Sequence, residues 1–221
     1  MDKLNLRPDE GESTPRAVAV LATDPAGDAF IPPHAHRRGQ LTRAFSGVMM
    51  VGAAAGSGVV PPGRGVWVPP GMTHQIRMAG EVKMRTVFVE PGTRADLGAE
   101  CRVIHVGALL RELIVAAVSL PLDYPPGGRD ERVMELILDE IEAAPALSLH
   151  VPMPRHARLA ALCEALIRDP AQPATLDGWA ARLHMNARTL TRLFERETGM
   201  TFGAWCRQAR LLLSLPRLAA G

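Results

Sequence analysis

The sequence contains little cysteine and no long apolar run, and each shortage excludes a class of protein. Its three cysteines, Cys101, Cys163 and Cys206, are far apart and form no C-x-x-C pair, so they do not read as a disulfide framework. The uncharged residues 48–63 are rich in Gly and Ala and fall short of the roughly 20 apolar residues that span a bilayer. The amino terminus, MDKLNLRPDEGEST, lacks the apolar segment of a signal peptide. We therefore expect a cytoplasmic protein with no membrane partner.

The net charge of +2 conceals an uneven distribution along the chain. Residues 1–154 carry 15 basic and 18 acidic side chains, whereas residues 155–221 carry 10 basic and 5 acidic ones. All ten basic residues of the second part are arginines. An arginine-rich end behind a mildly acidic body indicates that this end meets a polyanion.

Hydrophobic patterning separates a β-rich front from a helical rear. Between residues 16 and 106, short apolar segments are broken by Gly and Pro; they read RAVAVLAT, QLTRAFSGVMMVG, GSGVV, GVWVPP, HQIRM and KMRTVFVEP. This spacing predicts a sandwich or small barrel. Two helical segments follow, ALLRELIVAAVSL and ERVMELILDEIEAA. They cover the open side of the β domain or pack against a second protomer, and the two roles are compatible.

The C-terminal residues carry the pattern of two short helices joined by a tight turn. Thr175 and Asn186 are suitable N-caps for the two helices, and Gly199 is a suitable end for the second. Helical spacing places Leu190, Leu193 and Phe194 on one face of the second helix. It places Arg188, Thr191, Arg192 and Arg196 on or beside the opposite face. This arrangement has the form of a helix-turn-helix, although a solvated charged face would give the same pattern in a lone helix.

The whole segment TLDGWAARLHMNARTLTRLFERETGMTFGAWCRQARL resembles the first helix-turn-helix and the linker helix of AraC/XylS-type transcription regulators. The matching positions are Thr175, Leu176, Ala180, Arg188, Leu190, Arg192, Phe194, Glu197, Thr198, Gly199, Trp205, Ala209, Arg210 and Leu211. The resemblance implies that the second helix enters the major groove of double-stranded DNA. The predicted DNA-binding residues are Arg188, Thr191, Arg192, Arg196 and Asn186, because arginine can bind guanine bidentately or neutralise phosphate.

The front half contains two histidines one residue apart, in PPHAHRRGQ. In an extended strand, alternate side chains share a face, so His34 and His36 are expected to point the same way. The stretch resembles the first cupin motif, with Gly27, His34, His36, Gln40 and Gly47 at the matching places. GRGVWVPPGMTH resembles the second, with Gly63, Pro69, Gly71 and His74. Together with the C-terminal match, these motifs resemble the cupin-sensor subgroup of AraC-type regulators.

The resemblance makes His34, His36, Gln40 and His74 candidates for an effector or metal site. Metal-binding cupins usually add a carboxylate to three histidines, whereas Gln40 occupies that place here. The three imidazoles could hold a divalent metal with water completing the shell, or they could hydrogen-bond a small molecule. The apolar residues expected to line the cup or fill its core are Met49, Val51, Val66, Val68, Ile76 and Val87. His105, His150, His156 and His184 have no paired neighbour and are expected to be structural or surface residues.

The predicted fold class is α+β, with a cupin-type β-barrel, following helices and an all-α helix-turn-helix domain. The expected parts are a disordered segment at 1–15, the barrel at 16–106, a helical dimerisation or covering segment at 107–145, a linker at 146–155 and the DNA-binding domain at 156–221. Regulators of this type carry a second helix-turn-helix, but this sequence stops where the joining helix would end. We therefore expect weakened DNA affinity, which a homodimer would partly restore. Pro216 is expected to kink or end the last helix.

The leading prediction is a sequence-specific DNA-binding transcription regulator, not an enzyme, whose cupin domain senses a small-molecule effector. One alternative is a metal-dependent cupin enzyme of oxygenase or isomerase type, against which the missing carboxylate counts. A second alternative is a partner unable to bind DNA alone that forms mixed dimers with a full-length regulator.

Overall fold

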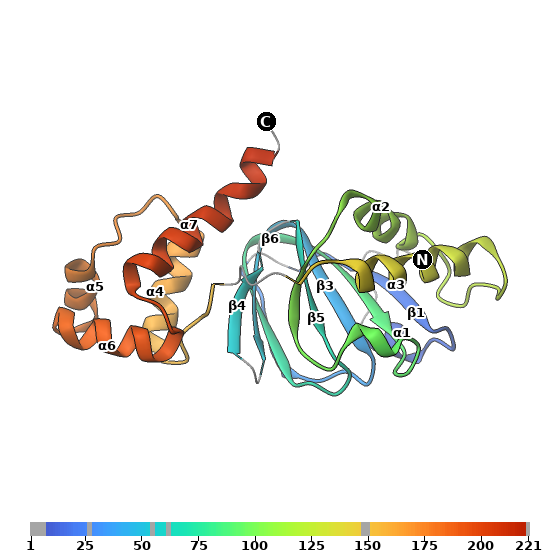
Figure 1. Cartoon of the computed structure of the whole chain (residues 1–221), viewed down its shortest axis with the longest axis horizontal. Helices are drawn as coiled ribbons and strands as arrows, with labels where there is room; N and C mark the ends of the chain where they lie inside the picture. Colours follow the sequence, from blue (N-terminus) through green and yellow to red (C-terminus); the bar gives the residue numbers. More distant parts are fainter. Residues whose placement is uncertain (1–7, 26–27, 54–55, 61–62, 147–150, 220–221) are drawn as a thin grey trace.

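The computed structural model describes residues 8–25, 28–53, 56–60, 63–146 and 151–219. Figure 1 shows a β-rich body with helices beside it and, at the opposite end of the molecule, a separate group of helices. This is the α+β class that the sequence predicts, with the strands preceding the C-terminal helices. Across the described residues, no helix has the length and apolarity that crossing a membrane requires.

The β-rich body is built from one bent antiparallel sheet. Its strands are β1 (Val18–Thr23), β2 (Phe30–His34), β3 (Gly39–Ala53), β4 (Gly56–Val60), β5 (Arg64–Val68), β6 (His74–Val89) and β7 (Arg102–His105). The main order is β1-β6-β3-β5-β7, while β2 adds to β6 and β4 adds to β3. The long central pair, β3 and β6, shifts register between Ala44 and Val48, and such bulges bend a sheet.

Two strands differ from the sequence prediction. The single strand β6 contains both HQIRM and KMRTVFVEP, which were expected to be separate strands. It passes through Gly80, which has a positive φ of 75°. Glycine reads as a turn in a sequence, but here it lies within a bent strand. Residues 102–105 form β7, which the sequence did not predict.

The two faces of the sheet hold different cores, because neighbouring residues in a strand point to opposite sides. The inner core contains Met49, Val51, Val66, Val68 and Ile76, as expected from the sequence. Val87, expected with them, belongs instead to the outer core with its cross-strand partner Leu41. The prediction for Val87 is therefore wrong, because its side chain points to the opposite face of the sheet.

Two helices cover the outer face, α2 (Ala108–Ala117) and α3 (Arg129–Ala143). Their buried residues, among them Leu110, Ile114, Ile137 and Ile141, pack into one cluster with the strand residues Leu41 and Trp67. The covering role expected for residues 107–145 is confirmed by this contact.

The N-terminal segment is ordered where the sequence suggested disorder. Residues 8–13 form the short helix α1 (Pro8–Ser13). A Cβ atom at Gly11 would lie 2.7 Å from the ring of Phe88 and 3.0 Å from Leu21, both of which are buried. The disorder expected for residues 8–13 is therefore wrong, because a glycine allows this segment to lie directly against the barrel; residues 1–7 are outside the described range.

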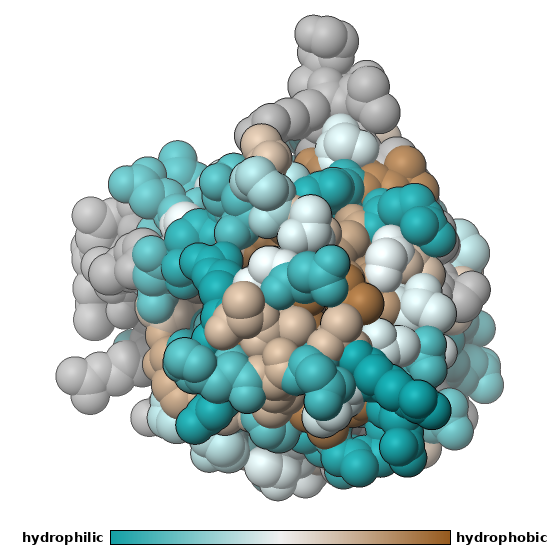
Figure 2. Space-filling view, turned by 90° about the vertical axis from the view of Figure 1, so that its left-hand side faces the viewer, coloured by the Kyte–Doolittle hydropathy of each residue, from teal (hydrophilic) through white to brown (hydrophobic). Residues whose placement is uncertain are grey.

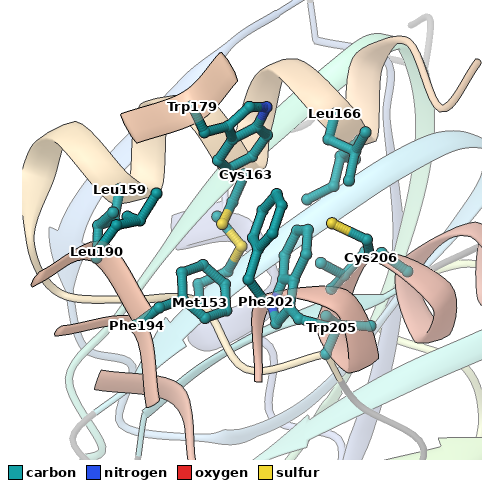
Figure 3. Close-up of a cluster of buried hydrophobic side chains, with 14 of the residues drawn as sticks. Met153, Leu159, Cys163, Leu166, Trp179, Leu190, Phe194, Phe202, Trp205 and Cys206 are labelled. Atoms are coloured by element: carbon teal, nitrogen blue, oxygen red, sulfur yellow. The ribbon is translucent and has the colours of Figure 1, made fainter. Parts of the chain in front are cut away.

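The remaining helices form a compact group, α4 (Ala157–Arg168), α5 (Leu176–Leu183), α6 (Ala187–Thr198) and α7 (Phe202–Ala219). Their shared core is drawn in Figure 3, where Trp179, Phe194, Phe202 and Trp205 lie close together. The ring centres of Phe194 and Trp205 are 5.9 Å apart in an edge-to-face arrangement, which aromatic pairs favour. Helix α7 extends to Ala219, so the expected end at Pro216 is not found, and the expected kink there stays a prediction.

The helical group also contacts the sheet directly. Met50 and Val59 of the sheet share a buried cluster with Met153 and the helices. The backbone N–H of Val59 donates to the carbonyl of Val151, at 3.2 Å. Two ion pairs add to the contact, Arg77 with Glu164 at 3.0 Å and Arg168 with Asp28 at 3.7 Å. Residues 147–150 of the expected linker, which include His150, lie outside the described residues.

We expect Gly47→Ala to destabilise the fold more than Gly92→Ala does. Both glycines have positive φ, so each substitution costs about 1–2 kcal/mol for the left-handed backbone. At Gly47 a Cβ atom would also lie 2.6 Å from the carbonyl oxygen of Glu81, whereas at Gly92 it meets nothing within 4 Å. Urea unfolding should show an additional loss of about 1–3 kcal/mol for Gly47→Ala, and equal losses would contradict the close approach of β3 to β6.

Candidate DNA-binding and effector sites

The helix-turn-helix is fixed by local hydrogen bonds at both of its helix starts. The hydroxyl of Thr175 accepts from the N–H of Gly178 at 3.2 Å, and the side-chain oxygen of Asn186 accepts from Thr189 at 2.7 Å. His184 ends α5 in the left-handed region, with φ 55°, which turns the chain between the two helices. The two caps predicted from the sequence are therefore confirmed.

Helix α6 separates an apolar face from a basic one. Leu190 and Phe194 are fully buried, whereas Arg188, Arg192 and Arg196 are exposed. In Figure 2 the end of the molecule formed by the C-terminal helices faces the viewer, and hydrophilic residues surround a weakly hydrophobic central area. A helix that buries one stripe and exposes three guanidinium groups is suited to lie against a nucleic-acid groove.

The other two predicted DNA contacts have local roles as well. Thr191 is half-buried, and its hydroxyl donates to the carbonyl of Ala187 at 2.9 Å. Asn186 is exposed, but its side-chain oxygen is used in capping α6. Their free polar atoms are the hydroxyl lone pairs of Thr191 and the amide group of Asn186.

Glu197 ties the end of α6 to the beginning of α4, a contact that the sequence analysis did not identify. One of its carboxylate oxygens accepts from the backbone N–H groups of Arg155 and His156, at 3.0 and 3.1 Å. His156 is the N-cap residue of α4, where free N–H groups attract a negative charge. The orientation of α6 is thus fixed at its far end by a contact with the chain that arrives from the barrel.

Three histidines converge at one end of the inner face of the sheet. His34 ends β2, His74 begins β6 opposite it, and His36 lies beyond β2 in the connection to β3. Their ring centres are 4.3 to 5.5 Å apart, and one ring nitrogen of each lies within 4.8 Å of those of the others. The expected convergence is confirmed, although His36 reaches the group from a loop and not by strand alternation.

Each imidazole is oriented by a bond at Nδ1. His34 Nδ1 bonds the carbonyl of Pro32 at 2.7 Å, and His74 Nδ1 bonds that of Met72 at 3.0 Å. His36 Nδ1 bonds the carboxylate of Glu12. A neutral imidazole that donates from Nδ1 keeps a lone pair on Nε2, which is the arrangement of histidines that bind metals.

Gln40 lies beside His74, in the place expected from the motif. Its amide nitrogen bonds His74 Nε2, and both side chains are buried. The pKa of His74 is lowered to about 4, mainly by burial and in smaller part by the neighbouring imidazoles of His34 and His36. His74 is therefore neutral near pH 7, and its Nε2 lone pair accepts a hydrogen bond from the Gln40 amide, which a metal bound at Nε2 would replace.

These residues fit a divalent cation bound by three imidazoles. The carboxylate of Glu12 bonds His36 Nδ1. It would therefore orient His36 as a ligand without binding the ion itself. His34, His36 and His74 would hold the ion through Nε2, and an open coordination position would accept an oxygen or nitrogen of the effector. The same lone pairs would also accept hydrogen bonds directly from a polar effector.

A charged network surrounds the histidines and was not predicted. Glu90 binds Arg37 and also Arg38, the latter at 2.9 Å, and Arg38 donates to the carbonyl of Thr14 at 2.6 Å. Glu12 connects this network to His36. These contacts join residues 24 to 53 positions apart, beyond the reach of local sequence patterns.

A pocket of about 590 Å³ opens on the other side of the loop that precedes His74. Trp67, Val89, Pro70 and Leu97 give it an apolar lining, and Glu90 and Arg94 are its charged residues. Because the loop residues Met72 and Thr73 also line it, a molecule in this pocket would contact the segment that carries His74.

The remaining histidines lie apart from this group. His105 is exposed and bonds Arg64, and His184 is exposed in the turn between α5 and α6. The Nδ1 atom of His156 is buried without a partner.

Comparison with known proteins identifies both halves of the chain. The family model for the AraC-like ligand binding domain matches residues 17–191, and that for a helix-turn-helix domain matches residues 179–221. The chain belongs to the AraC family of transcription regulators. This AraC-type protein is therefore a DNA-binding transcription regulator with an effector-binding domain, as the sequence predicts.

Two proteins similar in sequence to this AraC-type regulator, NimR and RipA, are themselves transcriptional regulators. The HTH-type transcriptional regulator NimR of Escherichia coli is 28% identical over 222 residues, covering 100% of this chain and 81% of NimR. RipA of Corynebacterium glutamicum, another HTH-type transcriptional regulator, is 31% identical over 118 residues, which are 53% of this chain and 33% of RipA. An apo ToxT variant from Vibrio cholerae aligns over 94% of this chain and 85% of its own, with 8% identity and a TM-score of 0.43.

Titration of the metal-stripped regulator with Zn²⁺, followed by calorimetry, tests the histidine group. We expect one ion per chain and at least about 100-fold weaker binding for His74→Ala, because one of three ligands is lost. His105→Ala is the matched control, since this exposed histidine lies outside the group. Equal affinities of His74→Ala and the unaltered protein would contradict a metal site at these residues.

Proposed function

We propose that this protein regulates transcription from the cytoplasm as a non-catalytic homodimer whose DNA affinity responds to an effector bound near His34, His36 and His74. The observation that carries the DNA-binding part is the exposed arginine face of α6, opposite the buried residues Leu190 and Phe194. Arg188 and Arg192 lie one helical turn apart, so both can reach one stretch of groove.

The effector site is proposed at the mouth of the barrel, with Gln40 as a fourth polar group. Its support is the convergence of three imidazoles, each oriented by a bond at Nδ1. A metal-dependent enzyme would use the same histidines. The regulator is the better proposal because the relatives over this chain are transcription regulators.

Arg192→Ala tests the proposed reading helix. We expect affinity for a fluorescent operator duplex, measured by anisotropy, to fall by about 5- to 150-fold, the effect of losing one guanine or phosphate contact of about 1–3 kcal/mol. Thermal unfolding should be unchanged, because Arg192 is exposed and makes no hydrogen bond or ion pair with the other described residues. Arg129→Ala, an exposed arginine on α3, should bind like the unaltered protein; equal binding by Arg192→Ala would refute the assignment.

The dimer interface is proposed on the outer surface of α2 and α3. Leu109 is 51% exposed, Val115 44% and Leu136 38%. On α2, Leu109 and Val115 are exposed on either side of Glu112, away from the buried Leu110 and Ile114. Exposed apolar side chains on the solvent side of a covering helix favour contact with another apolar surface.

Sedimentation velocity over a range of concentrations tests this interface. We expect dimers for the unaltered protein and at least tenfold weaker dimerisation for Leu109→Asp, because the charge would be buried in the contact. Leu211→Asp alters a leucine of similar exposure on α7 and should leave dimerisation unchanged. The proposal fails if the unaltered protein is monomeric throughout or if Leu109→Asp dimerises equally well.

A further inference from the structure

Two arginines lie directly opposite each other on the outer face of the sheet. Arg43 of β3 pairs in register with Arg85 of β6. Both guanidinium groups approach the ring of Phe45, Arg43 at 4.0 Å and Arg85 at 5.7 Å from its centre. Like charges at directly opposed positions destabilise a sheet. We therefore expect negative charge close to these two arginines.

The two arginines differ in how their charge is balanced. Arg85 forms an ion pair with Asp24 at 2.9 Å and donates to the carbonyl of Met84 at 2.7 Å. Arg43 is only 5% exposed, yet within the described part of the chain it has no ion pair. Its Nε and Nη1 atoms are fully occluded and have no hydrogen-bond partner, whereas Nη2 is not among the occluded atoms.

The neighbouring helix adds a further cation. The pKa of Arg43 is lowered to about 10, mainly by burial and in smaller part by Arg111 of α2, while Glu112 partly opposes both effects. Arg43 therefore remains charged near pH 7. Glu112 itself pairs with Arg111 at 2.7 Å, so its charge is already shared. A buried cation without a counter-ion is strongly unfavourable in a folded protein.

We propose that Arg43 and Arg111 bind a small anion that carries a carboxylate or phosphate group. Nη2 of Arg43 can donate to one oxygen of either group, and the exposed guanidinium of Arg111 can donate to another. Stacking on Phe45 holds the Arg43 guanidinium in a fixed orientation. The anion enters from the side of Nη2, and Arg111, whose side chain is 54% exposed, closes over it from α2.

This site is separate from the histidine group. Arg43 points to the outer face, whereas Gln40 and Thr42 of the same strand point inward with Phe88 and Thr86. Because Arg43 belongs to the sheet and Arg111 to α2, the bound anion would join the sheet to that helix.

Thermal unfolding of the full chain tests the proposal, with sodium phosphate and sodium acetate compared against sodium chloride at equal ionic strength. We expect phosphate, acetate or both to raise the Tm of the unaltered protein above its value in chloride. Arg43→Met should lose this response and, in chloride, have a Tm equal to or higher than that of the unaltered protein, because an unbalanced buried charge has been removed. Arg64→Met, which alters another β-strand arginine bonded to His105, should keep the response.

Calorimetric titration with the anion that raises the Tm, phosphate or acetate, gives a second measurement. It does not require a substitution of the buried Arg43. Arg111→Met changes an exposed side chain and should weaken binding at least tenfold without altering the Tm in chloride. A response to phosphate alone indicates a phosphorylated ligand, and a response to acetate alone indicates a carboxylic acid. The proposal is overturned if neither anion stabilises the unaltered protein beyond chloride, or if Arg43→Met responds as the unaltered protein does.

Discussion

The buried contact between the sheet and the C-terminal helices is the constraint on which the rest of the structure depends. The side chains of Met50 and Val59 point away from the inside of the barrel and pack in the same buried cluster as Met153 and Trp205. The indole N–H of Trp205 donates to the carbonyl of Pro152, at 2.6 Å, so the chain that arrives from the barrel is held against the core of the DNA-binding domain. Burial of these side chains, more than the two ion pairs beside them, fixes the domain in place, because exposed ion pairs contribute little.

Strand alternation gives the sheet two functional faces. On β6, His74 points inward to the other histidines, and Arg77, three residues later, points outward to Glu164 of α4. On β2, His34 joins the inner group while Phe30 stacks with Arg77 at 4.6 Å, because the register of β2 against β6 shifts between Ile31 and His34. The path from the proposed effector site to the DNA-binding domain is therefore a few residues of two paired strands. A regulator requires that its effector bind two arrangements of the molecule unequally, and these strands connect the two sites that would have to differ.

Much of the DNA-binding half could be predicted from the sequence, because its signals are local. The caps at Thr175 and Asn186 and the apolar stripe of α6 act within one or two helical turns. Convergence of His34, His36 and His74 followed from the resemblance of the two motifs. Contacts between distant segments could not be predicted in this way. Glu12 reaches His36 across 24 positions, and Glu197 reaches Arg155 across 42; only the folded chain brings them together.

Regulation of specific genes requires this protein to distinguish its operator from other DNA. A competition experiment measures this most directly: the chain is bound to a labelled duplex from the promoter beside its own gene, and unlabelled native or scrambled duplexes of equal length are added at moderate salt. We expect the native duplex to compete at least tenfold better than the scrambled one, because the arginines of α6 contact base edges in addition to phosphates. Equal competition by the two duplexes would show that the helix recognises only the DNA backbone, and would contradict sequence-specific regulation by this chain.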